Sequence, residues 1–340
     1  MKRIVLCFDG TWNTPADDGL PAADRIETNV SRFYESIRTV GADGVRQTRA
    51  YVPGVGTGRW DKIVGGVLGV GLDEHIREGY RKLVELYDDG DEVFILGFSR
   101  GAYTARSLVG MIRNSGLVTP KFGPVTRAAA YLLYRTREDD PDSDRSRRFR
   151  ARFAREAPIK FLGVWDTVGA LGIPLTLATR LNARFYEFHD TELSSIVERA
   201  YQALAIDEHR IDYAATLWAP KRKPGQYVEQ RWFAGAHCDV GGGYSDRRLS
   251  DLALRWIQDR AADAGLGLDA VSAPVEDYQG TATDSYARFL DGLYALKKPP
   301  YLRPIGATLG NETVDESVER RRRDASLAYA PANRTLPVLV

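Results

Sequence analysis

The chain has 340 residues, of which 44% are hydrophobic and 27% charged, a balance typical of a globular protein that buries a large core. Lys and Arg together (47) nearly match Asp and Glu (46), and a net charge of +1 excludes the broad basic field of a nucleic-acid binder. Two cysteines are too few for a disulfide framework, and no cysteine–histidine spacing indicates a zinc site.

Five short runs are apolar on successive residues, which is typical of parallel strands buried on both faces. In chain order they cover residues 4–8, 48–52, 92–98, 159–165 and 230–236. Amphipathic helical patterns lie between them at 24–38, 72–87 and 104–116. Strands that alternate with helices predict an α/β fold with a doubly wound, mostly parallel sheet.

Three regions interrupt this alternation. Residues 136–156 are densely charged and predict an exposed loop that runs into an Arg-rich helix. Residues 170–228 carry few strand signals and predict a helical cap insertion, and 297–304 form an irregular connector. We therefore expect a catalytic domain at 1–264, followed by a C-terminal extension at 265–340 that packs on the same domain.

No export or membrane signal is visible at the N-terminus. The first apolar run, Ile4–Phe8, is shorter than the core of a signal peptide. No stretch approaches the ~18 apolar residues of a membrane-spanning helix. We expect a cytoplasmic protein, or one exported by a route that reads no N-terminal signal.

The segment GFSRGA (97–102) has the G-x-S-x-G pattern of a nucleophile elbow and lies between an apolar strand and a helix. Such an elbow needs small residues, here Gly97 and Gly101, because the strained turn at Ser99 brings backbones close together. The following helix would point its first N–H groups at a developing negative charge. Ser99 is thus a candidate nucleophile; the alternative is a glycine-rich turn without chemistry.

A serine nucleophile needs a base, and the chain has four histidines, at 75, 189, 209 and 237. Only His237 directly follows an apolar strand, where this fold places the base last in the order Ser, Asp, His. The three glycines at 241–243 would let its loop bend toward the elbow.

The base in turn needs a carboxylate that fixes its tautomer. Asp166 ends the strand IKFLGVW and fits the required chain order. Asp239 is a rival two residues from His237, and Asp207 is a weaker candidate. A helix-capping role is the alternative for Asp166.

Backbone donors for an oxyanion are expected at two places. One is the N–H of Arg100, directly after the candidate nucleophile. The other is the N–H of Gly10 or Thr11, in the loop FDGTWN after the first strand, which Asp9 would hold by accepting backbone hydrogen bonds.

Six segments occur in an order that resembles a known family: FDGTWN, YVPGVGTG, GFSRGAYTAR, FLGVWDTVG, ALAIDEHR and WFAGAHCDVGGGY. They resemble a bacterial and fungal α/β-hydrolase family whose best-studied members are phospholipase effectors delivered by type VI secretion. The resemblance spans residues 3 to about 256. It implies an α/β-hydrolase fold and a triad of Ser99, Asp166 and His237. Larger members carry membrane-docking insertions, whereas this chain is close to the minimal catalytic unit.

These observations predict a serine hydrolase of carboxylic esters, of lipid or phospholipid type, that needs no metal or organic cofactor. A small-molecule esterase, thioesterase or amidase and a non-catalytic binding protein are the alternatives. The predicted partner is the ester or lipid substrate. We expect no nucleic-acid partner, and the prediction allows transient contact with a membrane surface. A lid would come from 59–72, which includes the apolar segment 63–72, or from 170–228.

Overall fold

The computed structural model describes residues 1–10, 26–54, 68–136, 138–169, 192–220, 223–306 and 311–333. Several predictions concern positions outside these ranges. They are Thr11, His189, most of the lid segment 59–72 and the first part of the cap segment, 170–191.

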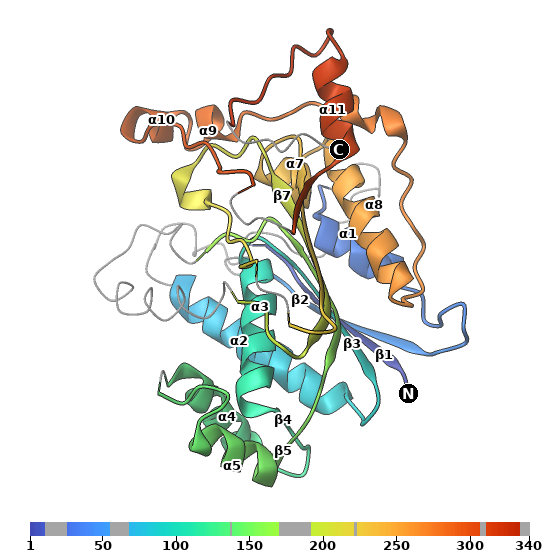
Figure 1. Cartoon of the computed structure of the whole chain (residues 1–340), viewed down its shortest axis with the longest axis vertical. Helices are drawn as coiled ribbons and strands as arrows, with labels where there is room; N and C mark the ends of the chain where they lie inside the picture. The colour runs from blue at the N-terminus through green and yellow to red at the C-terminus, as the bar shows by residue number, and fades with distance from the viewer. Residues whose placement is uncertain are drawn as a thin grey trace.

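The central sheet of the described residues has seven parallel strands in the order β2-β1-β3-β6-β7-β8-β9 (Figure 1). Their bounds are β1 (Arg3–Phe8), β2 (Gln47–Val52), β3 (Glu92–Phe98), β6 (Ile159–Trp165), β7 (Val197–Ala205), β8 (Tyr227–Phe233) and β9 (Glu312–Val314). The predicted α/β class with a doubly wound parallel sheet is confirmed.

Helices cover both faces of this sheet, which explains why its inner strands are apolar on successive residues. On one face, α2 (Leu68–Leu86) and α3 (Arg100–Ser115) pack over one hydrophobic cluster (Figure 1). On the other, α1 (Asn29–Ser36) and α8 (Arg248–Asp263) pack over a second cluster. Among the helices described, none is both long and apolar enough to cross a bilayer.

The prediction of a helical segment over 170–228 is wrong for β7, which lies in the sheet between β6 and β8. The sequence VERAYQALA hides this strand because charged residues open it and a polar residue, Gln202, lies in its middle. Gln202 is fully buried, and its amide bonds Gln230 Oε1 at 3.0 Å and the carbonyl of Thr216 at 3.1 Å. A buried polar group satisfied in this way leaves no apolar pattern in the sequence.

Between α3 and β6 the chain forms a small segment outside the central sheet. It consists of β4 (Leu117–Val118), α4 (Pro124–Arg135), α5 (Asp144–Phe153) and β5 (Ala154–Arg155), and β4 pairs with β5 antiparallel. The Arg-rich helix predicted within 136–156 is α5, whose first turn is capped by the Ser143 side chain.

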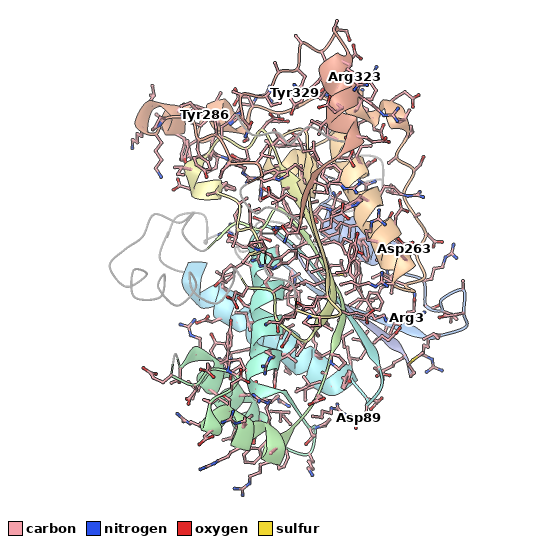
Figure 2. All side chains as sticks on the ribbon, viewed as in Figure 1. Arg3, Asp89, Asp263, Tyr286, Arg323 and Tyr329 are labelled. Atoms are coloured by element: carbon pink, nitrogen blue, oxygen red, sulfur yellow. The ribbon has the colours of Figure 1, made fainter. Side chains whose placement is uncertain are left out.

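After α8 the chain returns to the end of the molecule that carries the short helix α7 (His237–Gly241) (Figure 1). The returning segment contains η4 (Val275–Gln279), α9 (Ser285–Arg288), α10 (Leu293–Lys297), β9 and α11 (Glu316–Arg323). Within it, β9 pairs with β8 and extends the sheet. Figure 2 shows Tyr286, Arg323 and Tyr329 at this end of the molecule, with Asp89 toward the opposite end.

Strand order fixes where a site can form. From β1 the chain runs outward to β2 and then returns to the other side of β1 to form β3. In doubly wound sheets, ligands bind at the carboxyl ends of the strands beside such a reversal of direction. The residues that follow β1, β3, β6 and β8 are therefore brought to one edge of the sheet.

Candidate active site

Ser99 lies between β3 and α3 in the strained turn that the elbow pattern predicts. Its backbone angles are φ 58° and ψ −121°, a left-handed region that a residue with a Cβ adopts at a cost of about 1–3 kcal/mol. The Ser99 N–H donates to the carbonyl of Trp165 at 3.0 Å, and this bond links the elbow to the end of β6. The turn thus holds Ser99 next to Asp166.

The two elbow glycines lie where backbones approach closely. A Cβ on Gly101 would come within 2.2 Å of the Phe8 carbonyl oxygen and 2.5 Å of the Asp9 carbonyl oxygen. A Cβ on Gly97 would come within 2.5 Å of the Gly101 carbonyl oxygen. A larger residue at 101 would force α3 away from the end of β1, and one at 97 would force α3 away from β3, so both positions require glycine.

His237 begins α7 and contacts the candidate acid, Asp166, directly. Its Nδ1 lies 2.6 Å from Asp166 Oδ2, and both side chains are buried. The Phe98 ring, one residue before Ser99, lies 4.6 Å from the imidazole between centroids, and the Tyr213 ring meets it edge-on at 5.1 Å. Because an ionised Asp166 can only accept, Nδ1 carries the proton and Nε2 is left as an acceptor.

Helix α7 approaches the end of β3 through its last residue, Gly241. A Cβ on Gly241 would overlap the Phe98 ring at 1.9 Å, so only glycine lets α7 pack against the end of β3. This close approach gathers the residues after β3, β6 and β8 at one edge of the sheet.

Asp166 is fully buried and makes an ion pair that the sequence does not suggest. The Arg303 guanidinium donates to both of its carboxylate oxygens, at 2.5 and 3.0 Å, and the Ala205 N–H donates to Oδ1 at 3.0 Å. Burial opposes ionisation, but Arg303 and the His237 hydrogen bond outweigh it and hold the pKa of Asp166 well below its usual value. Asp166 is therefore a carboxylate throughout the neutral range.

The rival acids hold other groups. Asp239 accepts from the Ala236 and Thr283 N–H groups at 2.9 and 2.8 Å. Asp207 accepts from the Gly235 N–H at 2.7 Å and the Tyr329 hydroxyl at 2.8 Å. Both carboxylates fix the loop around His237 against the C-terminal segment, and the imidazole is left to Asp166.

The N–H groups of Arg100 and Gly10, two of the predicted oxyanion donors, differ in their hydrogen bonding. Helix α3 begins at Arg100, so its N–H is one of the first-turn donors that lack an acceptor within the helix. The Gly10 N–H instead donates to Asp9 Oδ1 at 2.6 Å. Asp9 also accepts from the hydroxyls of Thr28, at 2.7 Å, and Tyr51. Burial raises the pKa of Asp9 to about 6.

Glu208 and Arg210 form a second buried ion pair beside the imidazole that sequence reasoning missed. The Arg210 guanidinium meets both Glu208 oxygens, at 2.8 and 2.6 Å, and lies over the Tyr213 ring at 3.6 Å. Glu208 also accepts from the His237 N–H at 3.3 Å. Recognition of β7 would have exposed this pair, because residues 206–210 follow directly at its carboxyl end.

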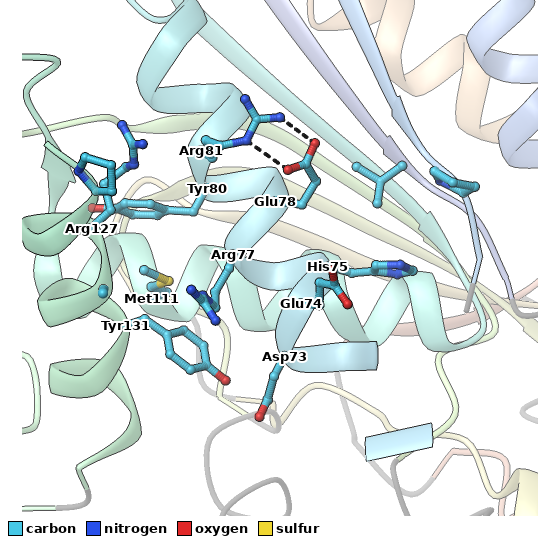
Figure 3. Close-up of a pocket in the computed structure, with 14 residues that line it drawn as sticks. Asp73, Glu74, His75, Arg77, Glu78, Tyr80, Arg81, Met111, Arg127 and Tyr131 are labelled. Carbon is cyan, nitrogen blue, oxygen red and sulfur yellow. Dashed lines mark hydrogen bonds and ion pairs between the residues drawn. The ribbon is translucent and has the colours of Figure 1, made fainter. Parts of the chain in front are cut away.

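Two of the hollows lined by described residues contain a histidine or an arginine named above. A cleft of about 860 Å³ between α2 and α4 contains His75, with Arg77, Tyr131 and the hydrogen-bonded pair Arg81–Glu78 (Figure 3). A pocket of about 540 Å³ opens next to the loop after α7, and its lining includes Arg210, Tyr244, Thr283, Ser285, Arg288 and Phe289. His75 thus belongs to the first hollow, whereas the second adjoins the Glu208–Arg210 pair.

With this geometry in view, residues 2–260 match the family described as "T6SS, Phospholipase effector Tle1-like, catalytic domain". The chain belongs to this family. Over 243 residues it is 28% identical to an uncharacterised protein of Saccharomyces cerevisiae, across 64% of this chain and 33% of that protein.

The solved structures that match this chain are more distant in sequence. An uncharacterised protein from Pseudomonas aeruginosa has a TM-score of 0.49 and 20% identity, over 87% of this chain and 51% of that one. The Tle1 effector bound to the VgrG spike of the type VI secretion system has a TM-score of 0.42 and 21% identity, over 72% and 51%. The Tle1-like chain described here thus spans about half the length of these two structures and a third of the yeast protein.

Proposed function

We propose that this Tle1-like chain is a serine hydrolase that cleaves carboxylic esters of lipid or phospholipid type. One observation carries the proposal: the imidazole of His237 is hydrogen-bonded to the buried carboxylate of Asp166 beside Ser99, which is held in a strained turn at the start of a helix. A glycine-rich turn without chemistry would require neither the buried carboxylate nor the histidine.

In the proposed reaction, Ser99 Oγ attacks the acyl carbon while His237 Nε2 takes the hydroxyl proton. Asp166 stabilises the imidazolium that results. As the tetrahedral intermediate collapses, His237 returns the proton to the leaving alkoxide and an acyl-Ser99 ester remains. Water, deprotonated by the same imidazole, attacks this ester, and the carboxylic acid leaves as Ser99 regains its proton.

The negative oxygen of the tetrahedral intermediate would be held first by the Arg100 N–H at the start of α3. The Gly10 N–H is a second candidate donor, but it is bonded to Asp9 and would have to share or exchange that bond. Removal of one such donor typically costs about 3–4 kcal/mol of transition-state stabilisation.

Hydrolysis of p-nitrophenyl esters of graded chain length tests the reaction and the substrate class together. The proposal expects activity that Ser99→Ala abolishes, and that increases with acyl length and with substrate in micelles or vesicles. Activity confined to short, dissolved esters would favour a soluble-metabolite esterase instead. Wild-type activity in Ser99→Ala would contradict the mechanism.

A further inference from the structure

Arg303 carries a buried guanidinium that meets the acid of the candidate triad from a distant part of the chain. Its side chain is fully buried, and it follows α10 in the connector 297–304. Besides both Asp166 oxygens, the guanidinium donates to the carbonyls of Ala205 at 2.8 Å and Tyr213 at 2.5 Å. Arg303 thus joins the carboxyl ends of β6 and β7 to the 3-10 turn η3 (Ile211–Tyr213).

The contacts of Asp166 leave its carboxylate little freedom to turn. Oδ1 accepts from Ala205 N–H and from one Arg303 nitrogen, and Oδ2 accepts from the other Arg303 nitrogen and from His237. A planar fork that holds both oxygens fixes the carboxylate plane as well as its position. A Lys ammonium, a point charge on a flexible stem, would fix neither as well.

We propose that Arg303 is a positioning residue of the triad: its guanidinium aligns Asp166 on His237 Nδ1 and sets the charge that the pair carries. This inference rests on the proposed function, since it assigns a role within the same reaction. It goes beyond the triad itself, because it makes the segment after residue 264 part of the catalytic apparatus.

The backbone around Arg303 is itself held in place. Asn333 Nδ2 donates to the Arg303 carbonyl at 2.9 Å. Two residues earlier, Tyr301 N–H donates to the His209 carbonyl at 2.8 Å, and the His209 ring meets the Tyr301 carbonyl at 3.1 Å. The backbone that carries Arg303 is therefore held in place by hydrogen bonds on both sides, and this fixes where its guanidinium meets Asp166.

The charge on Arg303 also affects when the Asp166–His237 pair takes up a proton. A nearby positive charge lowers the proton affinity of the pair as a whole, whichever member binds the proton. Other groups that face the pair are Glu208 with its partner Arg210, and Tyr213 and Cys238, whose pKa values burial raises. Arg210 is bonded to Glu208, whereas Arg303 is the cation in direct contact with the Asp166–His237 pair.

The test compares Arg303→Met, Arg303→Lys and a matched control, Arg321→Met, all measured against short esters across pH. Arg321 is also a buried arginine of the C-terminal segment, but it donates to the backbone carbonyls of Tyr278 and Gly280. Circular dichroism and Tm establish that each variant is folded. If Arg303→Met fails to fold, Arg303→Lys carries the test.

We expect Arg303→Met to lower kcat about 10²-fold with little change in KM, because the imidazole is no longer held in line. The acidic limb of its kcat/KM profile should move up by about one pH unit, because the pair binds its proton more tightly without the guanidinium. Arg303→Lys should keep the limb in place yet lower kcat. Arg321→Met should lower Tm alone.

A double-mutant cycle separates positioning from general stabilisation. If Arg303 acts through Asp166, adding Arg303→Met to Asp166→Asn should lower kcat no further. An equal loss in both backgrounds, or an Arg303→Met enzyme with the wild-type pH profile and kcat, would overturn the proposal.

Proton NMR tests the positioning role of Arg303 without requiring activity, so its outcome can be separated from failure of the proposed function. The Nδ1 proton of His237, identified by its absence in His237→Ala, should shift in Arg303→Met and stay in place in Arg321→Met. If the wild-type protein hydrolyses no ester, the proposed function fails, while this resonance still decides whether Arg303 positions the pair. An unmoved resonance in Arg303→Met would contradict the proposal.

Discussion

The two ends of the candidate triad, Ser99 and Asp166, are held in place by different kinds of interaction. At the nucleophile, geometry is held by backbone: a left-handed turn at Ser99 and glycines at 97 and 101 that let α3 approach β1. At the acid, geometry is held by charge, in the buried contacts of Asp166 with Arg303 and His237.

The difference has a consequence for how each end fails. A backbone turn defined by sterics responds to side-chain volume and hardly to pH. A buried ion pair responds strongly to the loss of either partner, because the remaining charge is left without compensation. Substitutions at the two ends should therefore give different signatures.

The largest expected effect falls on His237, which is hydrogen-bonded to Asp166 and packs against Phe98, one residue before Ser99. His237→Ala should lower kcat by about 10⁴–10⁶-fold, and Ser99→Ala combined with it should be no worse, since the triad acts as a unit. Steady-state hydrolysis of a p-nitrophenyl ester measures this. Multiplicative losses in the double variant would show that Ser99 and His237 act independently.

At the acid end, Arg303→Met should lower the free energy of unfolding by about 3–5 kcal/mol, the cost of leaving a buried carboxylate unpaired. The matched variant Arg321→Met loses bonds to neutral carbonyls and should cost about 1–3 kcal/mol. Urea unfolding of both variants measures the difference. Equal losses would mean that the charge of Asp166 adds nothing to the cost.

Asp9, beneath the elbow, should give the opposite pH dependence from Asp166. Burial raises its folded-state pKa from 3.8 to about 6, so the folded protein binds this proton more tightly than the unfolded chain. Wild-type stability should thus gain about 2–3 kcal/mol over Asp9→Asn as pH falls from 8 to about 4. Urea unfolding at fixed ionic strength measures this gain, and a pH-independent difference would contradict it.

The contribution of Asp166 to the free energy of unfolding has the opposite pH dependence. Its folded-state pKa lies below the usual 3.8, so its stabilising contribution is fully present above that value and is lost only as pH falls below it. Between pH 8 and 5 the ion pair at the acid end should therefore contribute no pH dependence to unfolding, which leaves the Asp9 signal readable.

The smallest effect is the steric one at the elbow. Gly101→Ala should destabilise the protein by about 1–3 kcal/mol, because its Cβ meets backbone that cannot swing aside. Gly110→Ala, in the same helix, is the control: its Cβ would meet Tyr134 at an ordinary 3.4 Å, and alanine should be neutral or favourable there. Thermal unfolding should separate the two variants, whereas equal Tm values would show that the elbow tolerates a side chain.

The strained turn at Ser99 was predictable because its determinants are local. A strand, a serine and two glycines within six residues define the turn, and the apolar strands on either side define the sheet. His237 and Asp166 were also accessible, since each follows a strand that its composition reveals.

The parts that escaped prediction depend on long-range pairing. Arg303 lies 137 residues from Asp166 in a stretch without any motif, and only the tertiary fold brings them together. β7 was mistaken for part of a helical insertion because Gln202 is buried by hydrogen bonds instead of apolar contacts. Polar groups that are satisfied inside a fold leave no periodic pattern for a sequence to display.

The most direct test of the central claim is mass spectrometry after treatment with a fluorophosphonate, a reagent that esterifies an activated serine. We predict a single adduct on Ser99 in the wild-type protein, absent in Ser99→Ala and strongly slowed in His237→Ala. An unlabelled Ser99 in the folded wild-type protein, in buffer and with detergent micelles, would contradict the assignment of Ser99, Asp166 and His237 as a working triad.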